Sequence, residues 1–167
     1  MSYKHVTVSN SLQLQLSVHS VQLRAFEPKL QAIERMRAKP KRKFSDDLLA
    51  ALRDSRGLRI RAGTGQHRFI GIWVVVVKDR AVVRSWSVQA NGWYRTLLKE
   101  PRGTIQVANR EIAVRAIRTK SEGLRDAVDR SYLDKYSTAS ALKYAKDLGR
   151  AKSRATTIEL VPLSSTR

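Results

Sequence analysis

The chain has 167 residues, 42% hydrophobic and 28% charged, a composition that predicts a compact domain with a sizeable core and excludes general disorder. It has no cysteine, which excludes disulfides, thiolate catalysis and cysteine-based zinc sites, and its longest apolar run, residues 70–77, is too short to span a bilayer. The 33 Lys and Arg against 14 Asp and Glu give a net charge of +19, which indicates an anionic partner such as nucleic acid, a phosphorylated cofactor or an acidic surface.

The chain divides near residue 43. Residues 1–43 have a net charge of +7 and end in a basic run, whereas residues 44–167 hold 24 basic and 12 acidic residues. Alternating apolar residues over 12–18 predict a strand, and Pro28 predicts the start of a short helix. The segment lacks the apolar core and cleavage site of a signal peptide, which favours a cytoplasmic location. We therefore expect a basic N-terminal extension, 1–43, that is poorly ordered or loosely attached, and one folded domain, 44–167.

The folded domain alternates strands and helices. Period-two alternation, apolar runs and turn residues predict six strands, at 58–62, 69–77, 81–87, 103–107, 111–117 and 155–161. Capping residues and apolar stripes predict helices after Ser45, over 93–98, after Ser121 and over 138–148. Because the first three strands follow one another through tight turns, they indicate an antiparallel meander. The expected fold is mainly β (α+β), a small six-stranded antiparallel barrel with peripheral helices.

Most motifs of catalysis are absent from the sequence. The three histidines lack metal-ligand spacing, and Gly63-x-Gly65 lacks the third glycine and the following helix of a dinucleotide loop. Carboxylates cluster only on the helix that carries Asp126, Asp129 and Asp134, where a solvated face is expected. The sequence thus offers no pair of acid and base for hydrolysis.

What remains is a set of arginine, serine and aromatic residues near strand ends. The arginines suited to a phosphate or carboxylate are Arg59, Arg61, Arg68, Arg84 and Arg95. The aromatic residues able to present a flat surface to a ring are Trp73, Trp86, Trp93 and Tyr94. Each has a structural alternative: Trp73 as core, Arg59 and Arg61 as the wet face of a strand, and the aromatic pair as an anchor for its helix.

Several sequence blocks, in order, resemble a family of small bacterial proteins that carry a domain of unknown function. The blocks are Arg59-Ile60-Arg61, Ile72-Trp73-Val74-Val75, Val83-Arg84-Ser85-Trp86, Gly92-Trp93-Tyr94-Arg95, Tyr132-x-x-Lys135-Tyr136 and Ala155-Thr156-Thr157-x-x-Leu160-x-Pro162. These proteins are similar to the FMN-binding split β-barrel superfamily, and within it to deazaflavin-dependent nitroreductases.

The resemblance implies a six-stranded split β-barrel, usually a homodimer, with FMN or a deazaflavin coenzyme in a groove at the barrel surface. By position, Arg61 and Arg68 flank the loop that contacts phosphate in the relatives. The groove is bordered by Arg84, Ser85, Trp93, Tyr94 and Arg95. The loop between Arg61 and Arg68 departs from the Gly-Arg-x-x-Gly type of the deazaflavin-binding relatives.

Three functions are compatible with this sequence. The favoured hypothesis is a flavin- or deazaflavin-binding oxidoreductase, in which the cofactor transfers a hydride and the protein binds and orients it. The second is a nucleic-acid or other polyanion binder, supported by the charge but without a recognisable binding motif. The third is a dimeric barrel without a cofactor.

Overall fold

The computed structural model describes residues 42–163, so almost all of the expected extension, with its strand over 12–18 and its helix at Pro28, lies outside the described residues. The elements follow in the order α2 (Asp46–Asp54), β1 (Leu58–Ala62), β2 (Ile70–Ile72), β3 (Val74–Val77), β4 (Arg80–Val83), α3 (Trp93–Lys99), β5 (Arg102–Val107), β6 (Arg110–Arg118), α4 (Glu122–Lys135), α5 (Ala139–Leu148), α6 (Ala151–Arg154) and β7 (Ile158–Pro162).

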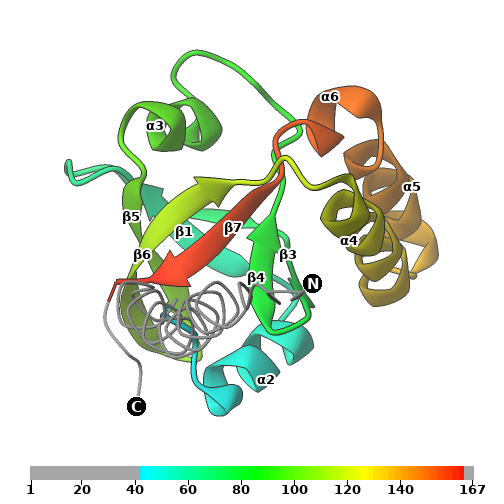
Figure 1. The fold of residues 1–167 in the computed structure, drawn as a ribbon, viewed down its shortest axis with the longest axis horizontal. Coiled ribbons are helices and arrows are strands. Elements are labelled where there is room, and N and C mark those ends of the chain that lie inside the picture. Colours follow the sequence, from blue (N-terminus) through cyan, green and yellow to red (C-terminus); the bar gives the residue numbers. More distant parts are fainter. Residues whose placement is uncertain (1–41, 164–167) are drawn as a thin grey trace, which may run out of the picture. The chain divides into compact units, whose positions relative to one another are not determined.

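The strands form one antiparallel sheet in the order β2-β1-β5-β6-β7-β4-β3. The two edge strands, β2 and β3, are separated only by Trp73, so they are the halves of the single strand predicted over 69–77. Because one half pairs with β1 and the other with β4, the bent strand joins the two edges of the sheet (Figure 1). The result is a nearly closed barrel with one seam at the bend, which confirms the expected mainly β fold with peripheral helices. The count is seven strands and not six because Trp73 interrupts the pairing.

Two hairpins have the tight turns that the sequence predicted. Lys78 and Asp79, with φ of 47° and 58°, join β3 to β4, and Ala108 and Asn109, with φ of 48° and 56°, join β5 to β6. Two consecutive positive φ angles match the twist of the flanking strands. The expected final strand starts three residues late because α6 precedes it.

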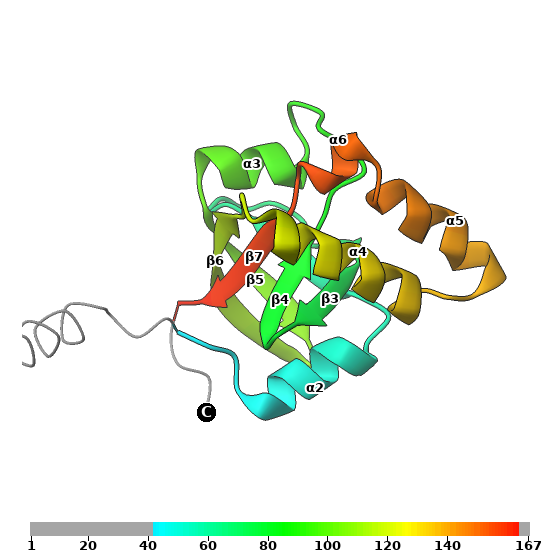
Figure 2. The ribbon, with the colours of Figure 1, turned by 45° about the vertical axis from the view of Figure 1, so that its right-hand side comes forward.

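Two hydrophobic clusters hold the barrel and its helices together. The barrel interior contains Ile60, Val83 and Ile105, with Leu48, Leu49 and Leu52 of α2 at one end and Tyr94 and Leu97 of α3 at the other. The second cluster lies outside the barrel, where α4 and α5 cover Val75, Val77 and Val82. Because both faces of β3 and β4 are covered, the sequences of Val74–Val77 and of residues 81–83 are apolar at every position. Figures 1 and 2 show α2 and α3 at opposite ends of the barrel and the remaining helices beside it.

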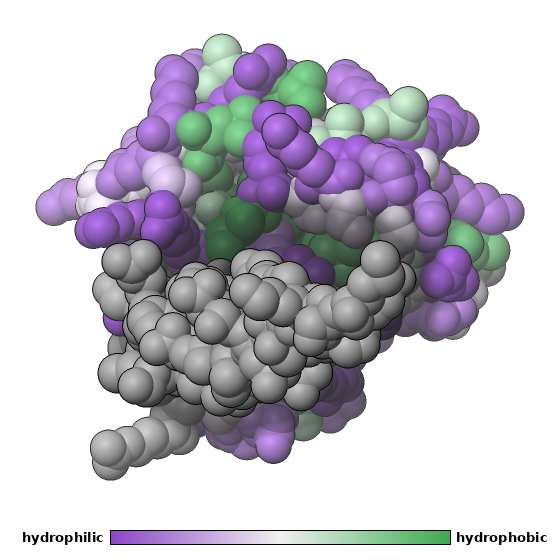
Figure 3. Space-filling model, viewed as in Figure 1, coloured by the Kyte–Doolittle hydropathy of each residue, from purple (hydrophilic) through white to green (hydrophobic). Residues whose placement is uncertain are grey.

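Hydrophilic residues cover most of the face seen in Figure 3, whereas hydrophobic residues gather in the hollow between α3 and α4. On this face the visible part of the described molecule is therefore mostly polar outside that hollow.

A buried arginine ties the helices to the barrel. Arg84, directly after β4, has 1% of its surface exposed. Its Nε donates to Thr157 Oγ1 (2.9 Å), Nη1 donates to the Leu148 carbonyl (2.9 Å) and to Asp129, and Nη2 donates to the Arg125 carbonyl (3.0 Å). Asp129 also accepts from Arg154 of α6. One guanidinium thus connects β4 to α4, to α5 and to the residue before β7.

The end of α4 clamps the bend between β2 and β3. Tyr136 Oη accepts from the Val74 amide and donates to the carbonyl of Val74 or Arg56, each at 3.1 Å. Lys135 Nζ donates to the carbonyls of Val74 (2.9 Å) and Leu52 (2.6 Å), the second of which lies in the last turn of α2. Backbone groups at the bend are therefore satisfied by side chains about 60 residues away in the chain.

Replacing Arg84 tests the buried network. Arg84→Met removes the hydrogen bonds to the Thr157 hydroxyl, the carbonyls of Leu148 and Arg125 and the Asp129 carboxylate, which keeps only Arg154. We expect the free energy of unfolding to fall by about 3–5 kcal/mol. The matched control is Arg53→Met, which removes an exposed ion pair with Asp79 at 2.9 Å and should change stability by about 1 kcal/mol or less. Urea unfolding followed by circular dichroism measures both, and equal losses in the two variants would contradict the role of Arg84.

The amine of Lys135 makes stability depend on pH in the alkaline range. Burial lowers the pKa of Lys135 from its usual 10.5 to about 8, and Asp54 opposes this shift. Between about pH 8 and pH 10 the unfolded chain binds a proton that the folded chain has released, so the free energy of unfolding should rise with pH. Lys135→Met should lose this rise. Urea unfolding at pH 7.5 and pH 9.5 checks it, and a parallel change in both proteins would show that Lys135 titrates normally.

Candidate functional site

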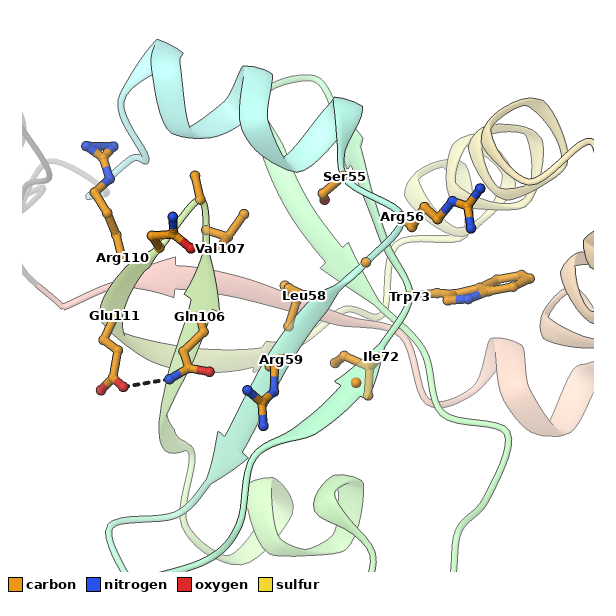
Figure 4. Close-up of a pocket in the computed structure, with 14 residues that line it drawn as sticks. Ser55, Arg56, Leu58, Arg59, Ile72, Trp73, Gln106, Val107, Arg110 and Glu111 are labelled. Atoms are coloured by element: carbon orange, nitrogen blue, oxygen red, sulfur yellow. Dashed lines mark hydrogen bonds between the residues drawn. The ribbon is translucent and has the colours of Figure 1, made fainter.

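A large pocket opens where α2 ends and β1 begins. It has a volume of about 760 Å³, and its walls come from the loop after α2, the ends of β1 and β2, and the β5–β6 hairpin. Gly57 is part of its wall, and this position needs glycine because a Cβ there would lie only 2.5 Å from the Ile72 carbonyl oxygen. Figure 4 shows Arg59, Gln106 and Glu111 pointing to one side of the pocket, with Gln106 hydrogen-bonded to Glu111 at 2.7 Å.

A second pocket continues the first around Trp73. It has a volume of about 540 Å³ and shares Ser55, Arg56 and Trp73 with the larger pocket. The start of α5 adds Thr138, its N-cap residue, and Ser140, in its first turn, to the wall. We call the two pockets together the Trp73 groove. Arg56 and Trp73 extend in the same direction, toward α4 and α5 (Figure 4).

Trp73 has a fixed place in this groove. One face of its ring stacks on Tyr136, with the ring centroids 3.8 Å apart and the planes 3° from parallel. Trp86 meets it edge to face at 5.2 Å. Since the clamp at the end of α4 holds Tyr136, the indole is held in turn, and its half-buried surface lies where both pockets meet. The structure therefore places Trp73 partly in the core and partly in a groove wall.

The cations of the groove differ in how they are engaged. Arg53 pairs with Asp79 at 2.9 Å and Arg110 with Asp47 at 2.6 Å, and all four side chains are exposed. Arg56 and Arg59 have no carboxylate within ion-pair distance among residues 42–163, although the Arg59 guanidinium lies 5.7 Å from the Phe69 ring centroid. Their guanidinium groups are therefore the donors of the groove that an anionic ligand meets without first breaking an ion pair.

Two residues expected from the sequence line a smaller pocket under α3. Arg68 and Trp93 meet there with His67, over an apolar floor of Ile60 and Ile70, and the volume is about 310 Å³. One expected phosphate residue and one expected ring residue thus line this cavity, as Arg59 and Trp73 do in the larger pocket.

The other expected residues lie apart. Tyr94 is buried in the barrel core, and Arg95 is exposed with its Nε bonded to the Val88 carbonyl at 3.1 Å. Arg61 lies on the outer side of β1, with its guanidinium 4.6 Å from the Phe69 ring centroid and 3.9 Å from Glu111. The structure does not bring these three residues into one site.

Arg84 and Ser85 lie inside the protein. The Arg84 guanidinium donates to protein acceptors from all three of its nitrogens, as described above. Ser85 donates its amide to Thr156 Oγ1 (2.8 Å) and its hydroxyl to the Ser87 carbonyl (2.6 Å). Both residues hold structure together in this arrangement.

Sequence reasoning did not single out Arg56 and gave Lys135 no role in a site. Arg56 lies in a loop with no periodic pattern, so no local signal identifies it. The spacing of Tyr132, Lys135 and Tyr136 was a signal for the clamp, because positions i, i+3 and i+4 share one face of a helix.

Within residues 42–163, no cluster of three or more histidine or acidic side chains has an arrangement that could hold a metal ion. No helix in the same part of the chain is long and apolar enough to cross a membrane. The chemistry visible in the described chain is that of cations, hydroxyls and aromatic rings.

Comparison with known proteins identifies a family. A search of the curated proteins finds no match. One solved structure that is similar is the conserved hypothetical protein Rv2991 from Mycobacterium tuberculosis, with 13% identity, a TM-score of 0.47, and coverage of 77% of this chain and 85% of that one. A family model matches residues 49–160, from α2 to β7. Since this match covers well over half of the chain, the protein belongs to the family described as an uncharacterized protein conserved in bacteria (DUF2255).

Proposed function

We propose that this protein binds a phosphorylated, planar ring cofactor of the FMN or deazaflavin kind in the Trp73 groove and acts as an oxidoreductase on a small molecule. The observation that carries the proposal is the position of Trp73, a held aromatic ring at the junction of two pockets, beside two arginines without carboxylate partners in the described chain.

The size of the groove supports a ligand of this class. Pockets for cofactors and drug-sized ligands have volumes of roughly 300–1,000 Å³ and combine apolar or aromatic walls with a few polar groups. The two parts of the Trp73 groove, about 760 and 540 Å³, lie in this range. The apolar wall comes from Leu58, Ile72 and Val107, and Trp73 supplies the aromatic surface.

The cations of the groove support a phosphate group on the ligand. A guanidinium binds phosphate through two parallel hydrogen bonds, which gives both affinity and orientation. Arg56 belongs to both pockets, and Arg59 lies in the larger one. Thr138 and Ser140 add hydroxyl donors on the α5 side. A cofactor with a ring near Trp73 and a phosphate near Arg56 would use both kinds of group.

In this proposal the bound cofactor supplies hydride transfer, and the residues of the chain bind and orient it. Arg56 and Arg59 would hold the phosphate, and the Tyr136 ring would keep Trp73 in place. Lys135 also lines the groove. Because burial lowers the pKa of its amine to about 8, this group can lose or gain a proton near neutral pH. The homodimer that the resemblance implies stays a prediction.

Cofactor titration tests the proposal. Full-length protein is titrated with FMN and with a reduced deazaflavin coenzyme, and binding is followed by flavin absorbance and tryptophan fluorescence. Loss of one charge-assisted contact weakens binding by about 1–3 kcal/mol, so we expect Arg56→Gln and Arg59→Gln each to raise Kd by roughly 5- to 150-fold. Exposed residues of this kind contribute little to folding, so both variants should unfold like the wild type.

Arg68→Gln is the matched control, because it removes the same charge from the smaller pocket under α3. We expect its Kd to stay within about twofold of the wild type. If Arg68→Gln loses more affinity for the cofactor than Arg56→Gln does, the cofactor binds in the pocket under α3. That result would overturn the Trp73 groove as its site. An unchanged spectrum with both cofactors would overturn the whole proposal.

A further inference from the structure

A row of arginines lies on the outer side of the barrel, next to the edge of the Trp73 groove that Arg59 forms. The registers of β1, β5 and β6 place Arg61 opposite Thr104, and Arg102 directly opposite Arg115. Arg102 and Arg115 are exposed, and their buried chain neighbours Gly103 and Val114 face the other side of the sheet. We call Arg61, Arg102 and Arg115 the arginine face.

The described helices do not cover this face. In Figures 1 and 2, α2 and α3 lie at the ends of the barrel and α4, α5 and α6 lie beside it, so the outer side of β1 and β5 is open. The residues between the arginines are small: Thr104 is half-buried and Ala113 is exposed. The small side chains between the arginines therefore leave the guanidinium groups accessible to a ligand.

The pairing of Arg102 with Arg115 is unfavourable in the free protein. Like charges directly opposite on one face of an antiparallel pair destabilise a sheet. Among residues 42–163, neither arginine has a carboxylate within ion-pair distance, and Arg61 has only Glu111 at 3.9 Å. The Glu100 carboxylate interacts electrostatically with Arg102, but it also accepts a hydrogen bond from the Thr64 amide (3.1 Å). An anion that bridges the two guanidinium groups would relieve the repulsion.

The spacing of the three arginines suits a chain of anions more than a single one. Residues directly opposite lie about 5 Å apart, and diagonal neighbours such as Arg61 and Arg102 about 7–8 Å. None of the three pockets described above is lined by Arg61, Arg102 or Arg115, so a lone phosphate would be held by few contacts. A polymer with successive phosphates would contact several arginines at once and gain affinity from each. The Phe69 ring beside Arg61 adds a surface on which a base can stack.

A second copy of the chain is a poor occupant of this face. An isologous contact would bring the Arg102 and Arg115 side chains of two copies toward each other and add to the repulsion. The charge that remains on residues 44–167, with 24 basic and 12 acidic residues, also favours a polyanion.

We propose that the arginine face binds single-stranded nucleic acid, with Arg61, Arg102 and Arg115 on successive backbone phosphates. Binding is independent of base sequence, because backbone contacts position a strand without reading its bases. The interaction does not depend on the cofactor proposal, since its arginines differ from Arg56 and Arg59.

Fluorescence anisotropy with labelled 15-nucleotide oligo(dT), oligo(U) and a duplex tests this at several salt concentrations. We expect the full-length protein to bind both single strands at 50 mM salt and to prefer them to the duplex. Arg102→Gln/Arg115→Gln should weaken binding at least tenfold. About 0.7 counterions are released for each phosphate contacted on a single strand. The slope of log K against log salt concentration should therefore be smaller by about 1.4 for this double variant than for the wild type.

The matched control is Lys143→Gln/Lys146→Gln on α5, which removes the same charge from two exposed positions of another element. We expect a loss of less than about threefold there. The basic run over residues 39–43 contributes the same background to every variant. Equal losses in both double variants, no binding by the wild type at 50 mM salt, or a preference for the duplex would overturn the proposal.

A second readout isolates the repulsion itself. Without nucleic acid, Arg102→Gln should unfold at a higher temperature than the wild type at low salt, and the difference should disappear in 0.5 M salt as the charges are screened, where the Debye length is only about 4–5 Å. A lower melting temperature at low salt would show that Arg102 is already compensated and would overturn the premise.

Discussion

The bend at Trp73 is the constraint on which the rest of the barrel depends. A single strand can close the sheet only if it leaves β1 and joins β4, and at that point its backbone groups need other partners. Tyr136 and Lys135 at the end of α4 supply them, so a helix far along the chain completes the sheet. The same bend turns the Trp73 ring toward α4 and opens a pocket on each side of it. Barrel closure and the Trp73 groove therefore have one physical cause.

The arginines of this protein have different roles that follow from their surroundings. Arg84 is enclosed between β4, α4 and α5, where an unpaired guanidinium would be strongly unfavourable, and every nitrogen of its guanidinium has an acceptor. In contrast, Arg102 and Arg115 are exposed to solvent and lie directly opposite each other. The contacts of Arg84 stabilise the fold, whereas the repulsion between Arg102 and Arg115 destabilises it until an anion binds between them. The high net charge is thus partly internal structure and partly surface available to partners.

The groove and the arginine face meet at β1 but differ in the ligand they suit. Arg59 points out of β1 into the larger pocket, and Arg61, two residues later, belongs to the exposed face. Aromatic and apolar walls around the first favour a single planar molecule with one phosphate. The flat and uncovered surface around the second favours an extended polyanion. Because the two sets have no arginine in common, a variant in one can serve as a control for the other.

Local patterns in the sequence determined most of the elements: β1 at Leu58–Ala62, the helix that Ser121 caps through the Leu124 amide, and both two-residue hairpin turns. These depend on neighbours within a few residues, which a pattern contains. The break at Trp73, the burial of Arg84 and the meeting of Arg56 with Trp73 depend on residues 45 to 80 positions away or on loops without periodicity. Residue type showed that arginines and aromatic rings would matter. Only the tertiary structure decided which of them are enclosed, which share a groove and which face solvent, because burial and charge pairing are set by contacts between distant segments.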